Sequence, residues 1–228
     1  GPITATLWKF SIPLMFGFFV NSLYSWIDTY FVAKLGASAI AAMGFCEQLN
    51  FFIFTFGSGI SIGASVIIAR RMGEGNFKAA EEVTRQSVMF VSIFGVALIG
   101  LLYLVINSVL RALGLEGETL TMAQSYMSIV LIGVPGIFVL FLVNAVVRAT
   151  GNSIFAMKVM LITVVVNAAL APTFIFGLGP IPAMGIFGAG LATALAQISG
   201  AVISMIALLA GGIGMQIERK IPKLDFTI

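Results

Sequence analysis

One aspartate stands in a run of aromatic and aliphatic residues, YSWIDTYFVAKLG, at residues 24–36. Asn21 and Tyr24 precede Asp28 by seven and four residues, so a helix would place the three side chains on one face. No lysine or arginine inside an apolar run is available to neutralise this carboxylate. Because removal from water favours the protonated form, Asp28 is expected to exchange a proton near neutral pH or to bind a cation such as Na⁺.

Further polar residues lie at a similar depth. Of the nine acidic residues, only Asp28 and Glu47 fall within apolar runs. Counted from the turn at residues 34–38 at about 1.5 Å per residue, Asp28 lies roughly 9 Å and Glu47 roughly 13 Å below the outer end. An intramembrane carboxylate usually faces a cavity or a partner and marks an ion or substrate route. We therefore predict a polar lining that also includes Asn167, Thr193 and Gln197, with Asn21, Tyr24, Glu47 and Gln197 in contact with substrate.

Each of these residues also has a structural interpretation. Asp28 could be a permanently protonated carboxyl that is hydrogen-bonded to a neighbour such as Asn167. Glu47 could lie at the water interface, only ten residues from the turn. The uncharged polar side chains could be hydrogen-bonding contacts between helices.

The composition is that of an integral membrane protein. Of the 228 residues, 60% are hydrophobic and 9% are charged, and the mean hydropathy is +1.11. The chain has no histidine and a single cysteine, Cys46, which excludes an intrachain disulfide, imidazole metal ligands and Ser-His triads. We therefore expect no enzyme activity, catalytic residue or cofactor, and the net charge of +3 is not the footprint of a nucleic-acid-binding protein.

Continuous apolar runs predict an all-α fold of transmembrane helices, because weak ten-residue alternation would be typical of a barrel. Proline residues 13, 135 and 172 are the expected kinks. The tail at 214–228 is predicted to be a cytoplasmic interfacial segment or the start of a linker to another lobe. The six predicted spans, which form one transmembrane lobe over residues 1–228, are residues 7–34, 39–70, 84–110, 121–147, 155–178 and 184–213.

The basic residues predict the orientation of the chain in a cell inner (plasma) membrane. Ten of the 12 fall on one side of the predicted spans, and only Lys34 and Arg111 fall on the other. By the positive-inside rule, both termini are expected in the cytoplasm. An even number of spans allows a second copy in the same orientation, as a tandem repeat or a parallel homodimer. The ten are Lys9, Arg70, Arg71, Lys78, Arg85, Arg148, Lys158, Arg219, Lys220 and Lys223.

Four stretches in order resemble the MATE family, the multidrug and toxic compound extrusion transporters. They are IPLMFGFFVNSLYSWIDTYFVAKLGASAIAAMG, in which a proline-containing span leads to an aspartate and a small-residue turn, ARRMGEGNFKAAEE, RATGNSIFAMKVMLITVVVN and FIFGLGPIPAMGIFGAGLATA. The resemblance covers essentially the whole chain. It implies one lobe, the amino-terminal one, of a transporter whose two six-span lobes flank a cleft and exchange H⁺ or Na⁺ for lipophilic cations by alternating access.

The resemblance also implies an ion-coupling set. In the archaeal and bacterial branch, a first-span aspartate works with an asparagine and an aspartate of the fifth span and a threonine of the sixth. Asp28, Asn167 and Thr193 match three of these positions, but Ala171 stands where the second acid is expected. Either Asp28 alone carries the ion, or Glu47 supplies the second carboxyl.

The expected function is therefore a secondary active exporter lobe in the lipid bilayer, completed by a second lobe or by a parallel homodimer. A lipid-linked oligosaccharide flippase of the same superfamily is one alternative, but it would need a basic cavity for the diphosphate. A non-transporting membrane scaffold or subunit is the other.

Overall fold

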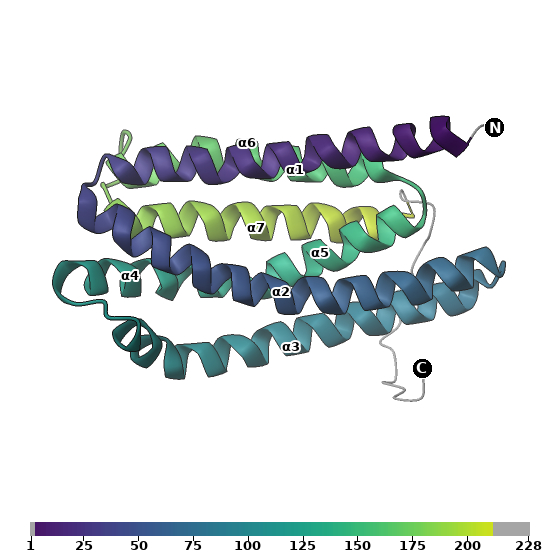
Figure 1. Cartoon of the computed structure of the whole chain (residues 1–228), viewed down its shortest axis with the longest axis horizontal. Coiled ribbons are helices and arrows are strands. Elements are labelled where there is room, and N and C mark those ends of the chain that lie inside the picture. The colour runs from purple at the N-terminus through teal and green to yellow at the C-terminus, as the bar shows by residue number, and fades with distance from the viewer. Residues whose placement is uncertain (1–2, 212–228) are drawn as a thin grey trace.

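Long helices that lie side by side build the whole described part of the protein (Figure 1). The structure is a computed structural model that describes residues 3–211, except for the side chains of residues 3–7, 9, 10, 13, 14, 18 and 21. The side chains of Asn21 and Pro13 and the whole tail at 214–228 therefore lie outside what the structure describes. The elements are α1 (Ile3–Ala33), α2 (Ala37–Gly73), α3 (Phe77–Ala112), α4 (Gly117–Val130), a 3₁₀ turn η1 (Leu131–Gly133), α5 (Val134–Ala149), α6 (Ser153–Phe176) and α7 (Gly185–Leu209).

The all-α fold class is confirmed, because residues 3–211 contain helices and no strand. Five of the passages are long and apolar enough to cross a membrane: α2, α3, α4 through α5, α6 and α7. The helix α1, with 31 residues, occupies the place of the remaining predicted span. The fourth predicted span is interrupted by η1, which ends just before Pro135, where the missing backbone N–H cannot complete an α-helical turn.

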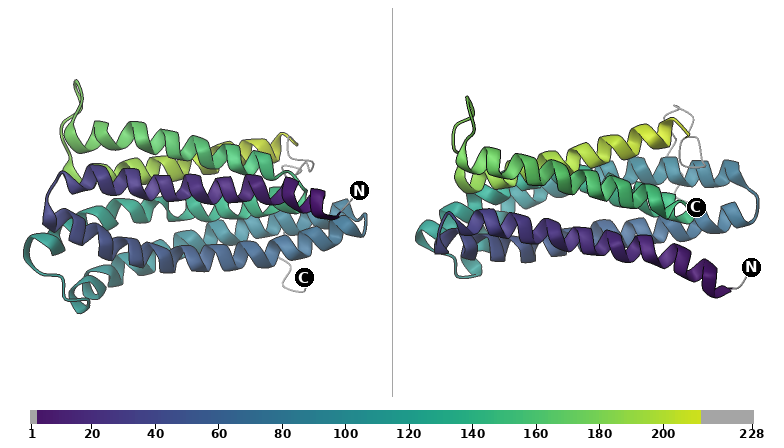
Figure 2. Two further views of the ribbon diagram at one scale, coloured as in Figure 1. Left: turned by 45° about the horizontal axis from the view of Figure 1, so that its top comes forward. Right: turned by 90° about the horizontal axis from the view of Figure 1, so that it is seen from above.

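The helices form two groups that meet through α5 and α7. In one group α6 packs against α1 and α7, and in the other α2 and α3 pack against α5 (Figures 1 and 2). Contacts of α7 with α4 and α5 join the groups. Ten of the 16 residues of α5 are buried, against seven of 36 in α3, so the core lies around α5 and α3 is peripheral.

Two glycines at the start of α7 set its distance from its neighbours. A methyl group added to Gly188 would lie 2.5 Å from the backbone oxygen of Phe174 in α6. One added to Gly190 would lie 2.9 Å from the backbone oxygen of Tyr126 in α4. Small residues allow such close approach of helices in a membrane, where no hydrophobic force holds them together. The stretch GIFGAG thus fixes α7 against two helices directly before Thr193.

Most of the described basic residues lie at one end of the bundle, which we call the basic end. The α2–α3 and α5–α6 turns lie there together with the start of α1 and the end of α7 (Figure 1). That this end faces the cytoplasm stays a prediction. The described basic residues within or beside these turns are Arg70, Arg71, Lys78, Arg85, Arg148 and Lys158, whereas Lys34 and Arg111 lie toward the opposite end.

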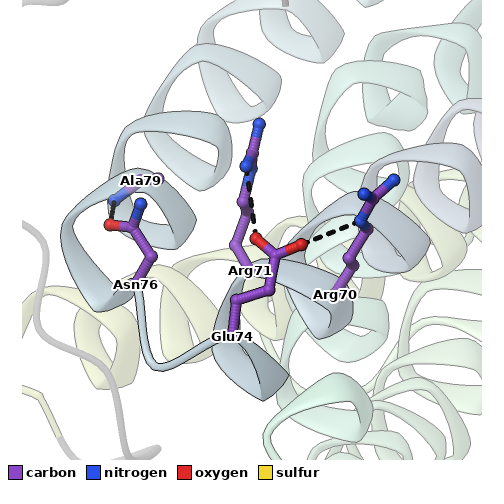
Figure 3. Close-up of polar contacts among 5 residues, drawn as sticks. All are labelled: Arg70, Arg71, Glu74, Asn76 and Ala79. Carbon is purple, nitrogen blue, oxygen red and sulfur yellow. Dashed lines mark hydrogen bonds and ion pairs between the residues drawn. The ribbon is translucent and has the colours of Figure 1, made fainter.

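The α2–α3 turn is held by charge pairs and a helix cap (Figure 3). Glu74 accepts hydrogen bonds from Arg70 at 2.9 Å and from Arg71 at 3.2 Å, and these two guanidinium groups lower the pKa of its carboxyl. The side chain of Asn76 accepts from the backbone N–H of Ala79 and caps α3. Because these ion pairs are exposed, they orient the turn more than they stabilise the fold.

The close approach at Gly190 gives a test of the packing. We expect Gly190→Leu to destabilise the protein by about 1 to 3 kcal/mol, because the side chain would displace α7 from α4. The matched control is Gly100→Leu in α3, where an added methyl meets no atom of the described residues within 4 Å. Thermal unfolding of the purified variants measures the difference, and equal stability of the two would contradict the packing described.

Candidate functional site

A chain of hydrogen bonds joins α1, α6 and α7 around Asp28. The hydroxyl of Thr193 donates to Asp28 Oδ2 at 3.0 Å. The amide nitrogen of Asn167 donates to Thr193 Oγ1 at 3.4 Å and to the phenolic oxygen of Tyr24 at 3.2 Å. We call Tyr24, Asp28, Asn167 and Thr193 the Asp28 cluster.

Local helix geometry explains how these side chains meet. Tyr24 and Asp28 are one turn apart on α1, so both face the same side. Asn167 lies on α6, which packs against both α1 and α7. Thr193 is held there because Gly188 and Gly190 bring the first turns of α7 close to α6 and α4.

Three members of the cluster, Asp28, Asn167 and Thr193, are buried, and two of the cluster's oxygens have no donor. Asp28 is 2% exposed and Asn167 is 0% exposed. Within the described residues, Asp28 Oδ1 and Asn167 Oδ1 have no hydrogen-bond partner. An unsatisfied buried polar group costs about 1 to 3 kcal/mol, and more when it is charged. A proton on the carboxyl, or a cation that shares these oxygens, would remove that cost.

Glu47 has a different neighbourhood from the other candidates. Its carboxylate is half-buried and accepts a hydrogen bond from Ser25 of α1 at 3.2 Å. Ser25 lies three residues before Asp28, which is about one helical turn. The carboxylate of Glu47 therefore contacts α1 about one turn away from Asp28. The structure therefore places Glu47 beside the Asp28 cluster, where its described hydrogen bond is to Ser25 and not to a member of the cluster.

Gln197 lies one turn further along α7 than Thr193, toward the basic end. Its side chain is buried, and a methyl group added to Gly133 of η1 would lie 2.4 Å from its Oε1. The structure thus directs Gln197 to the break between α4 and α5. It does not join the hydrogen bonds around Asp28 that the described residues make.

Two residues beside the cluster, Tyr126 and Ser25, were not predicted from the sequence. Tyr126 of α4 is 2% exposed and lies close enough to Asp28, Tyr24 and Thr193 to interact with them. A tyrosine in an apolar helix is usually a core residue, so nothing in the sequence distinguished it. Ser25 could have been found, because its spacing from Asp28 places it on the same side of α1.

The oxygens of the Asp28 cluster are of the chemical type that binds hard cations. Carboxylate, amide and hydroxyl oxygens are hard ligands, and the cluster contains one acid. In the part of the chain that the structure describes, no three His, Cys, Asp or Glu side chains gather into a metal site. With Ala171 fully buried on α6, the fifth span adds no second carboxylate here.

Comparison with known proteins establishes the family. A family model described as MatE matches residues 13–173, which is more than half of the chain. The chain belongs to the MatE family. The sequence resemblance to MATE transporters is confirmed, and with membrane-length helices and bacterial relatives the chain is an integral membrane protein.

Three relatives illustrate the similarity. A protein named "FAD transporter" from Shewanella oneidensis is 29% identical over 84% of this MatE chain and 42% of its own length. "Multidrug export protein MepA" from Staphylococcus aureus is 25% identical over 97% of this chain and 49% of its own. A solved structure described as the outward-facing conformation of a multidrug resistance MATE family transporter is 28% identical, with a TM-score of 0.89 over 97% of this chain and 48% of its own.

These relatives are named as transporters and not as enzymes, in agreement with the sequence. The MatE chain spans about half the length of the curated relatives that it matches. This length is consistent with one lobe of the family's fold.

Thr193 is the residue to test first in the Asp28 cluster. Thr193→Val keeps the shape but removes the donor to Asp28 and the acceptor for Asn167, so we expect a loss of about 1 to 3 kcal/mol in stability. Thr193→Ser keeps the hydroxyl and should retain most of it. Thermal unfolding compares the two, and a valine variant as stable as the unaltered protein would show that these hydrogen bonds contribute nothing.

Proposed function

We propose that this chain is one lobe of a secondary active transporter that exports lipophilic cations in exchange for H⁺ or Na⁺ by alternating access. Asp28 takes up the coupling ion, with Asn167 and Thr193 as its neighbours. Tyr24, Asn21, Glu47 and Gln197 line the substrate route. Both termini lie in the cytoplasm of a cell inner (plasma) membrane.

The observation that carries this proposal is that one oxygen of Asp28 has no hydrogen-bond partner, in a cluster whose side chains come from three helices. A carboxylate inside a membrane that had only a structural role would be expected to have all its acceptors satisfied. An ion bound at Oδ1 changes the charge between α1, α6 and α7. Since a ligand shifts a conformational equilibrium only through its different affinity for the two states, these helices are the ones that such an ion would bias.

The second lobe is part of the proposal. Because the chain spans about half of its relatives, either the remainder of a longer chain or a second copy in parallel orientation completes the cleft. In the homodimer, two copies of Asp28 would be related by the two-fold axis.

A dinucleotide such as FAD is the second candidate substrate, favoured by the relative named "FAD transporter". Its two phosphates would need basic partners. The hydrogen-bonded residues of the Asp28 cluster include a carboxylate but no lysine or arginine, so we place lipophilic cations first. The same lack of a lysine or arginine disfavours a lipid-linked oligosaccharide flippase, which would have to bind a diphosphate.

Transport in liposomes tests the proposal. We expect the full transporter to accumulate a fluorescent lipophilic cation when a pH or Na⁺ gradient is imposed, and the effective gradient identifies the ion. Asp28→Asn should remove the dependence on the gradient, because an amide carries no exchangeable charge. Glu116→Gln, at an exposed position before α4, is the matched control and should transport normally.

Three results would contradict the proposal. Gradient-driven transport that persists in Asp28→Asn would show that Asp28 is not the coupling group. Uptake of FAD without uptake of the cation would favour the dinucleotide. No counterflow of either compound by the complete transporter would favour a scaffold.

The stoichiometry of the 228-residue chain in a bilayer can be measured separately by crosslinking. A discrete parallel dimer would support the homodimer, because the symmetric partner then supplies the second lobe. A monomer would contradict it and leave the longer chain as the source of that lobe.

A further inference from the structure

A second set of polar residues lies closer to the basic end than the Asp28 cluster. On α7, Gln197 and Ser204 follow Thr193 by four and eleven residues, spacings that keep all three on one face of the helix. At about 1.5 Å per residue, Ser204 lies roughly 16 Å from Thr193 along the helix axis. The face thus continues from the cluster toward the basic end.

Asn144 of α5 lies at the same level as Ser204. The helices α5 and α7 run in the same direction, so each later position on α5 contacts a correspondingly later position on α7. Methyl groups added to the glycines of this interface would lie 3.2 Å from Ala194 for Gly133, 3.4 Å from Ile198 for Gly136 and 3.2 Å from Leu140 for Gly200. The offset between contacting positions is therefore close to constant, and it pairs position 144 with positions 204 to 206.

Both side chains are buried with unsatisfied polar atoms. Asn144 is 3% exposed and Ser204 is 0% exposed. Asn144 Oδ1 and Ser204 Oγ have no hydrogen-bond partner among residues 3–211. Buried polar atoms without protein partners are usually satisfied by ordered water, and two such atoms at one level supply two of the hydrogen bonds that a buried water needs.

We propose that Asn144 and Ser204 hold a buried water, and that this water is the inner end of a proton route between Asp28 and the basic end. The second half of this inference rests on the proposed function of Asp28, whereas the hydration site does not. Arg148 follows Asn144 by one turn and is half-buried at the end of α5, so polar groups continue to the surface there. Gln197 lies between the two levels.

Apolar side chains lie between the two polar levels. Leu140, Val159 and Ala201, from α5, α6 and α7, form a small buried cluster of their own. Ala201 lies between Gln197 and Ser204 on α7, so the cluster separates the polar level of Asn144 from that of Thr193. Proton passage requires these three side chains to move apart, which would let water join the two levels.

Cysteine accessibility tests the hydration site without relying on transport. In a Cys46→Ser background, Ser204→Cys and Leu208→Cys are each exposed to Ag⁺ in the full transporter. Leu208 is 0% exposed and lies one turn nearer to the end of α7, which makes it the matched control. The fraction of unreacted thiol is then read with a fluorescent maleimide after unfolding.

We expect the thiol at position 204 to react about tenfold faster than the thiol at position 208, because a hydrated thiol ionises more readily than one in apolar contact. Adding Asn144→Leu should reduce the rate at 204 to that at 208. Equal rates at 204 and 208, or a faster rate at 208, would overturn the hydration site. If Ser204→Cys does not fold, Asn144→Cys is compared with Leu208→Cys in the same way.

The proton route is tested by infrared spectroscopy of the Asp28 carboxyl after a pH jump on the side of the basic end. The band is assigned by its loss in Asp28→Asn. Ser204→Ala and Asn144→Leu should slow its protonation, whereas Ser61→Ala should not, because that buried hydroxyl bonds to Gly57 of its own helix. Unchanged rates in the first two variants, or an Asp28 band that never titrates, would overturn the route and leave the labelling result to decide the water site.

Discussion

The hydrogen bond from Thr193 to Asp28 is the interaction on which the arrangement of this lobe depends. It joins the first described helix to the last, in an interior where the described residues offer Asp28 no basic partner. Thr193 is placed for this bond by the close approach of α7 to α6 and α4, which the glycines at positions 188 and 190 permit. Asp28 is only half satisfied, so under the proposed function an ion bound at its free oxygen would alter the balance among three helices.

The extent of the helices could be predicted because apolar length is a direct requirement of the bilayer. The interruption at η1 could be predicted only from Pro135, because a proline removes a backbone hydrogen bond of its helix whatever the neighbouring helices are. Asp28 was evident for a similar reason, since a carboxylate within an apolar run carries a cost that nothing nearby in the sequence offsets. Tyr24 followed from its spacing.

The contacts between helices could not be derived from the residues alone. Asn167 and Thr193 were assigned to Asp28 through a family resemblance, and the direction of Gln197 toward Gly133 depends on how α5 and α7 cross. Tyr126 and the pair of Asn144 and Ser204 were not identified for the same reason. Their residue types occur in many membrane helices, and only the register between two helices gives them a role.

The most deeply covered passage, α4 through α5, is also among the most apolar in sequence. Hydropathy therefore does not separate a helix that faces lipid, such as α3, from one that faces protein, because the two surroundings have nearly the same polarity. The consequence concerns biogenesis. Such a segment can partition into the bilayer on its own as it leaves the translocon, before the helices that will cover it have been synthesised. Its burial is then a later event, in which α7, made last of the described helices, displaces lipid from a surface that was already stable in the membrane.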